Sequence, residues 1–391
     1  MKFTNYQTKL IVTFMLTICC LNNSISQEYG IKFIPLEFSI NPFNLWEQND
    51  KLYVSSINNI ENIPGSSIIE LNYNLDTIAT YFYPNIIFGR NGPQLIDNKL
   101  YAYCEEVLYD DRSLLVVIDQ EFKIVRRDTF YTQAANFNIN SMNQLAGEII
   151  GVGIDDNDCE PNCYEMNIKA IDTEGSQLSS FNLDENENYF FSFQTGTTND
   201  NNLLIGGINY TPWAKASLFK VSTDGNVFWN YKSSSKSSRG NIPISALELS
   251  NGNIVYTDKL YKIDDDDYLE LGFTHEPNQL VWLSSESDSL MSYLDTVSWN
   301  SSTEYYGLVE GMGDYFFVHG HYSKGSTVED PLDGYFGFVM KMSNVGEIIW
   351  RRAYHIGGDI TNGNFITQML ELENGDLITV GVAATDTSLE T

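Results

Sequence analysis

Two stretches of this chain of 391 residues repeat one pattern: KVSTDGNVFW at residues 220–229 and KMSNVGEIIW at residues 341–350. Each stretch passes from a strand-like run through a turn that contains Gly225 or Gly346, and then into a second run that ends at a tryptophan. A glycine-containing turn between two apolar runs is a strong signal for a β-hairpin. Because weaker copies follow one another along the chain, the sequence predicts a repeat architecture.

A second repeated motif gives each unit another hairpin. It is a turn of Gly, Asp and Asn followed by three or four apolar residues, as in NGNIVYT (251–257) and NGDLITVG (374–381). Successive copies begin 48 to 62 residues apart, at Leu52, Leu100, Ile149, Leu203, Ile254, Tyr315 and Leu377. Two hairpins make four strands, which is one blade of a β-propeller. The sequence therefore predicts an all-β protein, a β-propeller with seven four-stranded blades.

The expected positions of the strands within a blade also follow from the pattern. The apolar pairs Phe316-Phe317 and Leu377-Ile378 predict inner strands that are buried on both faces. The outer strand after Gly225 alternates, which predicts Val227, Trp229 and Tyr231 on one face. No stretch shows a sustained helical period with capping residues, so little helix is expected.

The closure of the ring has two interpretations that stay open. The seventh unit contains its first hairpin (365–381), but the chain ends at Thr391 before a second hairpin. The segment 29–38 belongs to no unit, and pairing it as the outer strand of the last blade would cover an exposed edge. That blade would still be one strand short. Either the last blade is incomplete, or the chain is truncated at its C-terminus.

The N-terminus has the pattern of a secretory signal peptide. Lys2 and Lys9 precede an apolar run at 10–21, and Ser24-Ile25-Ser26 follows it. This predicts a signal peptide at 1–26, a β-propeller domain at 27–391 and a secreted or cell-surface protein. The apolar run is too short to span a bilayer comfortably, so no membrane insertion is expected.

The charge of the chain restricts its partners. The net charge is −30, and removal of the signal peptide, with two lysines and no acidic residue, makes it −32. Such a charge repels nucleic acid and anionic lipid. The expected partner is a glycan or another protein. The chain itself is expected to be a monomer.

Three cysteines remain after the predicted cleavage. Cys159 and Cys163 lie in one short loop with Pro161-Asn162 between them, and the chain can fold back there to bring the two Cα atoms within the roughly 4.4–6.8 Å that a disulfide requires. In an oxidising compartment a Cys159–Cys163 disulfide is expected. Cys104 takes the repeat position that other units fill with glycine (Gly153, Gly207, Gly381), which predicts a small buried residue.

No metal, cofactor or catalytic residue is assigned from the sequence. Asp155, Asp156, Asp158 and Glu160 form one acidic loop, and Asp264, Asp265, Asp266 and Asp267 form another. Neither matches a known Ca²⁺ loop, so solvated carboxylates are expected, with Ca²⁺ binding as the alternative. His319 and His321 would share one face of a strand, but no third ligand is evident. Motifs for a serine nucleophile elbow, a phosphate loop and a zinc protease are absent from the sequence. Trp229 and Trp350 share one repeat position, which predicts packing between blades.

Residues 44–381 resemble propellers of the quinoprotein-like class, in which strand, Asp-x-x-Gly-like turn and tryptophan-bearing strand recur. Among them, the chain is similar to secreted repeat propellers of Bacteroidetes, which are type IX secretion substrates and alternate ELxNGDxIxVG (here 371–381) with DxxGxxxW. The likeness is strong in units four, six and seven and weak in one, two and five. Quinone-binding enzymes of this class carry a disulfide between adjacent cysteines, whereas the one adjacent pair here, Cys19-Cys20, lies in the predicted signal peptide.

These observations favour a non-enzymatic secreted propeller that acts as a binding or surface-interaction module. The alternative is a secreted enzyme with a site in the central funnel, either carbohydrate-active or a quinoprotein-type dehydrogenase. Converging carboxylates or histidines at the funnel would favour the enzyme, and an aromatic patch on one rim would favour binding.

Overall fold

The computed structural model contains β-strands and no α-helix among the residues that it describes. No helix there is long and apolar enough to cross a membrane. The described residues are 12–14, 16–19, 29–32, 35–36, 39–60, 62–89, 92–107, 113–130, 138–145, 148–155, 165–171, 177–182, 190–209, 215–233, 245–259, 278–295, 303–324, 334–354 and 364–384.

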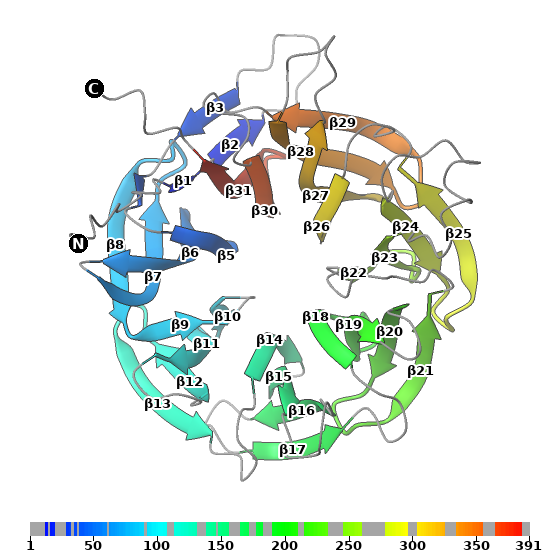
Figure 1. Ribbon diagram of the computed structural model, residues 1–391, viewed down its shortest axis with the longest axis horizontal. Helices are drawn as coiled ribbons and strands as arrows, with labels where there is room; N and C mark the ends of the chain where they lie inside the picture. Colours follow the sequence, from blue (N-terminus) through cyan, green and yellow to red (C-terminus); the bar gives the residue numbers. More distant parts are fainter. Residues whose placement is uncertain are drawn as a thin grey trace, which may run out of the picture.

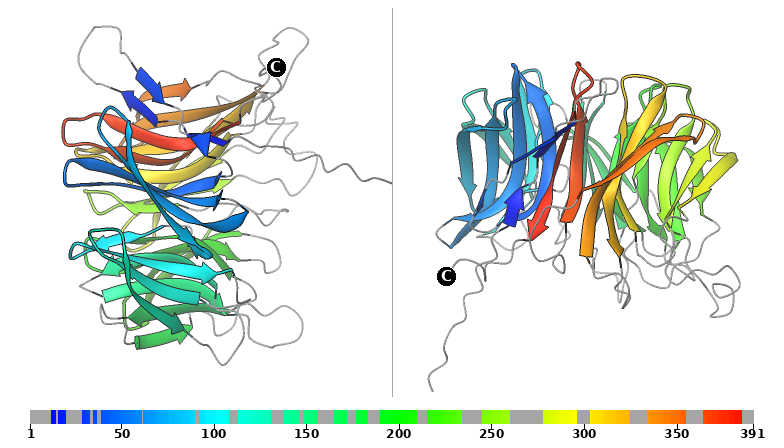
Figure 2. Two further views of the ribbon diagram at one scale, coloured as in Figure 1. Left: turned by 90° about the vertical axis from the view of Figure 1, so that its left-hand side faces the viewer. Right: turned by 90° about the horizontal axis from the view of Figure 1, so that it is seen from above.

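The described strands form seven antiparallel sheets arranged in a ring (Figure 1). Seen from the side, the ring is a disc whose strands run between its two faces (Figure 2). Five sheets are blades of four consecutive strands. The first is β5 (Ser39–Gln48), β6 (Lys51–Ile60), β7 (Ile63–Leu71) and β8 (Thr77–Pro84). The next is β14 (Asn138–Leu145), β15 (Glu148–Asp155), β16 (Glu165–Ile171) and β17 (Gln177–Asn182). Then come β18 (Phe190–Thr197), β19 (Leu203–Asn209), β20 (Lys215–Val221) and β21 (Val227–Lys232). The fourth is β22 (Ala246–Glu248), β23 (Ile254–Lys259), β24 (Asn278–Leu283) and β25 (Ser289–Leu294), and the fifth is β26 (Thr303–Glu310), β27 (Tyr315–Lys324), β28 (Gly334–Ser343) and β29 (Ile348–Tyr354).

Two sheets depart from this plan. The five-stranded sheet contains β9 (Ile86–Phe88), β10 (Gln94–Ile96), β11 (Lys99–Glu106), β12 (Ser113–Ile118) and β13 (Ile124–Phe130), and both β9 and β10 pair with β11. The six-stranded sheet contains β1 (Val12–Phe14), β2 (Leu16–Cys19), β3 (Tyr29–Lys32), β4 (Pro35–Leu36), β30 (Asn364–Glu371) and β31 (Leu377–Ala384). The all-β propeller is therefore confirmed, whereas seven four-stranded blades is wrong: only five sheets are regular four-stranded blades.

The ring closes through strands from both ends of the described chain. β31 pairs with β30 on one edge and with β1 and β2 on the other, and β3 pairs with β2. β3, within the segment 29–38, is the outer strand of this sheet, as the pairing interpretation predicts. The prediction that the sheet would still be one strand short is wrong, because β2 lies between β31 and β3 and the order β30-β31-β2-β3 has four strands. Residues 12–19 belong to the predicted signal peptide, and its boundary after Ser26 stays a prediction.

The hydrophobic core is divided among the contacts between neighbouring blades. One cluster joins Leu45 and Val54 of the first blade to Ile378 and Val380 of β31. The apolar pairs predicted for the inner strands are fully buried, as in Phe316 and Phe317. The side chains of the second strand therefore pack on both faces, as the sequence indicated.

The outer hairpin uses one turn design in five sheets. The first turn residue is Asn, Asp or Ser, and its side chain accepts a hydrogen bond of 2.8–3.0 Å from the backbone N–H four residues later, in the turns 72–76, 119–123, 222–226, 284–288 and 343–347. The fourth residue has a positive φ in all five: 93° at Gly225 and 86° at Gly346, but also 65° at Leu75, 60° at Phe122 and 70° at Ser287. Three of the five turns therefore adopt the positive φ that favours glycine although they have no glycine at this position.

The glycine column of the second strand has a packing cause. A Cβ at Gly320 would overlap the carbonyl oxygen of Glu304, and one at Gly381 would overlap that of Phe365. In both blades the inner strand has a β-bulge at this level, which brings its backbone close.

The two repeated tryptophans pack between blades, as predicted. Trp229 Nε1 donates to the carbonyl of Ser285 in the next blade at 2.9 Å. Trp350 packs against a cluster that includes Phe317 of its own blade and Ile366 of β30.

Candidate functional site

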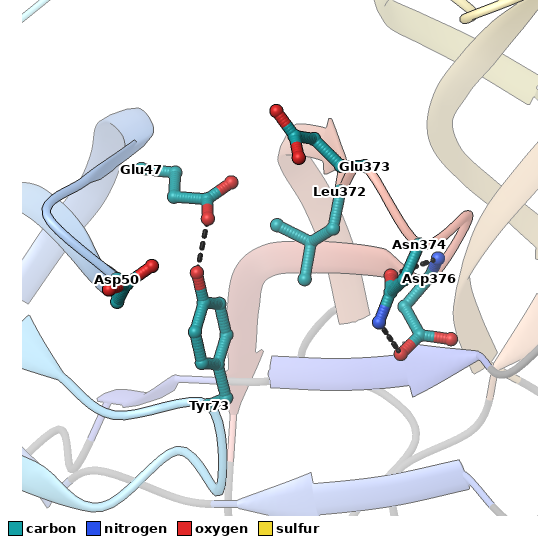
Figure 3. A pocket seen from close by; sticks show the side chains of 7 residues that line it. All are labelled: Glu47, Asp50, Tyr73, Leu372, Glu373, Asn374 and Asp376. Atoms are coloured by element: carbon teal, nitrogen blue, oxygen red, sulfur yellow. Dashed lines mark hydrogen bonds between the residues drawn. The ribbon is translucent and has the colours of Figure 1, made fainter.

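The candidate site is a cavity of about 390 Å³ at the seam between the first blade and the sheet that contains β30 and β31 (Figure 3). Because consecutive strands are antiparallel, the turn between the first and second strands of a blade and the turn between the third and fourth strands lie on the same face of the ring, here called the turn face. The cavity is formed by three of these turns. We call it the seam pocket, and its lining residues are Glu47, Asp50, Tyr73, Leu372, Glu373, Asn374 and Asp376.

The acidic side chains of the pocket are presented by tight turns. Asn49 and Asp50 connect β5 to β6 with positive φ values of 52° and 58°, so this two-residue turn places Asp50 at its tip. Between β30 and β31, Asn374 Oδ1 accepts from the backbone N–H of Asp376 at 2.9 Å, and Asn374 Nδ2 donates to Asp376 Oδ2 at 2.9 Å. Gly375 has φ 84° in the same turn. The Asp376 carboxylate is thereby held in one orientation.

Tyr73 supplies an aromatic ring and one hydrogen bond across the pocket. Its hydroxyl donates to Glu47 (Figure 3). The hydrogen bond to this carboxylate is the main cause that raises the pKa of Tyr73 to about 12. Tyr73 is therefore a neutral phenol at physiological pH, fixed by an anionic partner from a different hairpin.

The lining restricts what the pocket can bind. It contains four carboxylates, one phenol, one amide and the buried side chain of Leu372, and no lysine, arginine or histidine. An anionic ligand would be repelled. A cationic group would gain charge-assisted hydrogen bonds from the carboxylates and contact with an aromatic ring. Carboxylates are also the catalytic groups of glycoside hydrolysis, so the lining does not exclude an enzyme.

The histidine pair lies in a different place and is packed into the interior. His319 is buried, and its Nδ1 lies 3.1 Å from the carbonyl oxygen of Ile366. Burial lowers its pKa to about 4, so the imidazole is neutral near pH 7. His321 packs edge-on against Phe365 with 4.6 Å between ring centroids. Both rings face β30, on one face of the strand as predicted. Among the described residues, no group of three or more His, Cys, Asp or Glu is placed to hold a metal ion.

Cys104 is the buried small residue that its repeat position predicted. It lies opposite Phe88 in the sheet, and its thiol is 3.4 Å from the carbonyl oxygen of Ala102. Burial raises the pKa of this thiol well above its usual value, which keeps it protonated and unreactive.

Several predicted sites lie outside the described residues and stay predictions. These are the Cys159–Cys163 disulfide and most of the two acidic loops: Asp156, Asp158, Glu160, Asp264, Asp265, Asp266 and Asp267. Asp155 ends β15, and nothing is described of its side chain.

The seam pocket is not evident from the repeat pattern of the sequence. The pattern predicts a turn at 374–376 but does not connect it with the acidic residues of the first unit. The available signal was that Glu47 and Asp50 begin the first unit while Glu373 and Asp376 belong to the last one. In a closed ring these units become neighbours, so the same turn position in both contributes to one site.

No protein-family model and no curated protein matches the chain. Solved structures match with low identity. The β-propeller domain of the Trilobed protease from Pyrococcus furiosus is 13% identical, covers 82% of this chain and 99% of its own, and has a TM-score of 0.44. An acylaminoacyl peptidase from Pyrococcus horikoshii is 11% identical over 81% of this chain and 52% of that chain, with a TM-score of 0.43. A quinohemoprotein alcohol dehydrogenase from Pseudomonas putida is 9% identical over 88% and 67%, with a TM-score of 0.43. At such identities the likeness concerns the fold alone, so a quinoprotein-like neighbour is present but no activity follows.

Proposed function

We propose that this protein is an exported, non-enzymatic β-propeller that binds a protein ligand, and that the seam pocket receives a lysine or arginine side chain of that ligand. The observation that carries the proposal is the pocket lining, with four carboxylates, the Tyr73 ring and no basic residue. The ammonium or guanidinium group pairs with the carboxylates, and its aliphatic stem lies along Leu372. The net charge of −30 attracts such ligands over a longer range.

A secreted enzyme is the second candidate, because the pocket carboxylates are groups that can also cleave glycosidic bonds. This alternative was expected in the central funnel, whereas the seam pocket lies between two blades. Release of reducing sugar from an oligosaccharide panel by the full chain would replace the binding proposal with the enzyme.

The test of binding uses isothermal titration of the full chain with hexalysine, hexaarginine, hexaglutamate and a neutral oligosaccharide. The variant Glu373→Gln/Asp376→Asn keeps the shape of the pocket and removes two charges. Charge-assisted hydrogen bonds contribute about 1.5–3 kcal/mol each, so affinity for the basic peptides should fall at least about tenfold. Asp97→Asn/Glu121→Gln is the matched control, since it also removes two charges and both carboxylates are exposed and lie outside the pocket.

The outcomes separate the possibilities. Equal loss in Asp97→Asn/Glu121→Gln and in the pocket variant would mean that the basic peptides respond only to the overall charge. Tighter binding of the oligosaccharide than of either basic peptide would replace the protein ligand with a glycan.

Export, a monomeric state and a seven-bladed ring belong to the same proposal. The N-terminal pattern at 1–26 supports export, and the high net charge opposes self-association. Seven repeat units in the sequence and seven sheets among the described strands support a count of seven blades, five of them regular. N-terminal sequencing of the exported protein should begin at Gln27.

A further inference from the structure

The outer strands share a β-bulge that the function of the seam pocket does not use. In six sheets, the first residue of the outer strand lies opposite a residue of the neighbouring strand, the second residue is extra and has no residue opposite it, and regular pairing resumes at the third residue. The extra residue is apolar in every case: Ile78, Val125, Leu178, Phe228, Leu290 and Ile349. A bulge changes the direction in which a side chain points.

The bulge residues point outward where their side chains are described. The exposed fraction is 50% for Ile78, 55% for Val125, 58% for Phe228, 51% for Leu290 and 52% for Ile349. A repeated outward position on an outer strand would ordinarily be polar. Burial in the fold therefore does not explain why this position is apolar.

One bulge residue, Leu290, is next in sequence to an exposed apolar residue that lies where the β22–β25 blade adjoins the β26–β29 blade. Met291 follows Leu290, and a Cβ placed on Gly346 would overlap the Met291 methyl carbon. Met291 therefore touches the turn 343–347, in which Val345 is 66% exposed. We call Leu290, Met291 and Val345 the rim patch.

The two turns next to the rim patch carry charged residues of one sign. The turns 284–288 and 343–347 carry exposed Glu286, Asp288 and Glu347, and neither contains lysine or arginine. The turn before them, 222–226, adds Asp224. In contrast, Val125 in the β9–β13 sheet has Lys123 and Arg127 beside it in the sequence, both exposed. The rim patch is thus an apolar surface with an acidic border.

We infer that the rim patch binds an apolar segment of another protein that carries lysine or arginine beside its apolar side chains. Charge complementarity selects this partner, because basic side chains pair with the acidic border while apolar ones cover Leu290, Met291 and Val345. A second copy of the chain would bring the same acidic border and a net charge of −30 against it. An anionic membrane is repelled for the same reason.

The test measures binding of short fluorescent peptides to the full chain by anisotropy. One peptide alternates leucine and lysine, the second replaces leucine with serine, and the third replaces lysine with glutamate. The variant Leu290→Ser/Met291→Ser/Val345→Ser removes the apolar surface and keeps all charges. The control Ile78→Ser/Val125→Ser removes bulge residues elsewhere on the rim. Because all these side chains are exposed, the variants should unfold at nearly the wild-type urea concentration.

The leucine–lysine peptide should bind more tightly than the other two. The rim-patch variant should weaken it about tenfold or more while leaving the serine–lysine peptide unchanged, since covering one large apolar side chain contributes about 1.5–3 kcal/mol. Glu286→Gln/Asp288→Asn/Glu347→Gln should weaken both lysine peptides. Equal binding by the rim-patch variant, equal loss in the control, or equal binding of the leucine–glutamate peptide would overturn the inference. Two further results would also overturn it: binding of the wild-type chain to phosphatidylcholine vesicles, or dimerisation of the wild-type chain in sedimentation, if the rim-patch variant abolishes that binding or dimerisation. Seam-pocket variants leave the rim patch intact, so each proposal can fail without the other.

Discussion

Replacing Arg351 with methionine should strongly destabilise the ring, because it leaves a buried carboxylate without its ion-pair partner. Asp295 follows β25 and is fully buried; Arg351 lies on β29 of the next blade. Arg351 Nη1 donates to Asp295 Oδ1 at 2.9 Å, and the hydroxyl of buried Tyr305 donates to Asp295 Oδ2 at 2.9 Å. Both carboxylate oxygens are thus satisfied across a blade boundary.

The magnitude follows from burial and from the number of bonds lost. Removing one partner of a buried ion pair costs about 3–5 kcal/mol, and the 17% exposure of the Arg351 side chain places this pair near 3 kcal/mol. Loss of the Tyr305 hydroxyl in Tyr305→Phe removes one hydrogen bond to a charged group, about 1.5–3 kcal/mol. Asp295→Asn combined with Arg351→Met should cost less than the sum of the two single changes, because the uncompensated charge is absent.

Urea unfolding followed by tryptophan fluorescence measures these differences, and Arg352→Met is the matched control. Arg352 is the next residue, and its guanidinium lies over the Trp350 ring at 5.2 Å, a contact for which we expect about 1 kcal/mol or less. If Arg351→Met costs no more than Arg352→Met, or if the double variant is fully additive, the buried pair does not join the two blades as argued.

Three further changes test the repeat geometry and the buried histidine by the same urea assay. Gly320→Ala should cost at least about 1–3 kcal/mol, because the added Cβ would overlap the backbone carbonyl of Glu304; wild-type stability would contradict this cause of the glycine column. Ser287→Gly should stabilise by about 1 kcal/mol, because Ser287 has φ 70° in a turn where two other blades have glycine; a loss of stability would contradict it. Burial lowers the pKa of His319 to about 4, so the unfolded chain binds more protons between about pH 6.5 and 4, and stability should fall by up to about 3 kcal/mol as the pH drops through that window. His319→Gln should remove this part of the pH dependence, and an unchanged slope would refute it.

The sequence predicted the fold most clearly in the repeat units whose turns contain the residue types that the turn conformation favours. Gly225 and Gly346 mark the fourth position of the outer turn, and the two units that contain them were the clearest. Leu75, Phe122 and Ser287 adopt the same positive φ without being glycine, and these units were the weak ones. The cause is that the side chain at the first turn position already holds the loop through the N–H four residues later, so tertiary context can tolerate a strained residue.

The seam pocket could not be read locally, because closure of the ring joins two ends of the described chain. Glu47 and Glu373 are neighbours only if the last sheet lies against the first blade, and that depends on the packing of β31 against β5 and β6. The turn composition was visible in the sequence, but the partner of each turn was not. Only the assumption of a closed ring would have connected them.

The outward position of the bulge residues was hidden by an error in the phase of the outer strand. The alternation after Gly225 predicted Val227, Trp229 and Tyr231 on one face, yet Val227 is 44% exposed and Phe228 is exposed beside it. The bulge places Phe228 as an extra residue between the pairs Val221–Val227 and Lys220–Trp229, so the regular alternation begins only at Trp229. A single inserted residue reverses the face on which the earlier side chains of the strand lie, and a search for strict alternation in one strand does not detect the insertion. Comparison of equivalent positions in different blades does detect the insertion. The outer strand begins with two apolar residues also in Ile124-Val125 and Ile348-Ile349, although an alternating strand with one exposed face should have a polar residue at one of the two positions.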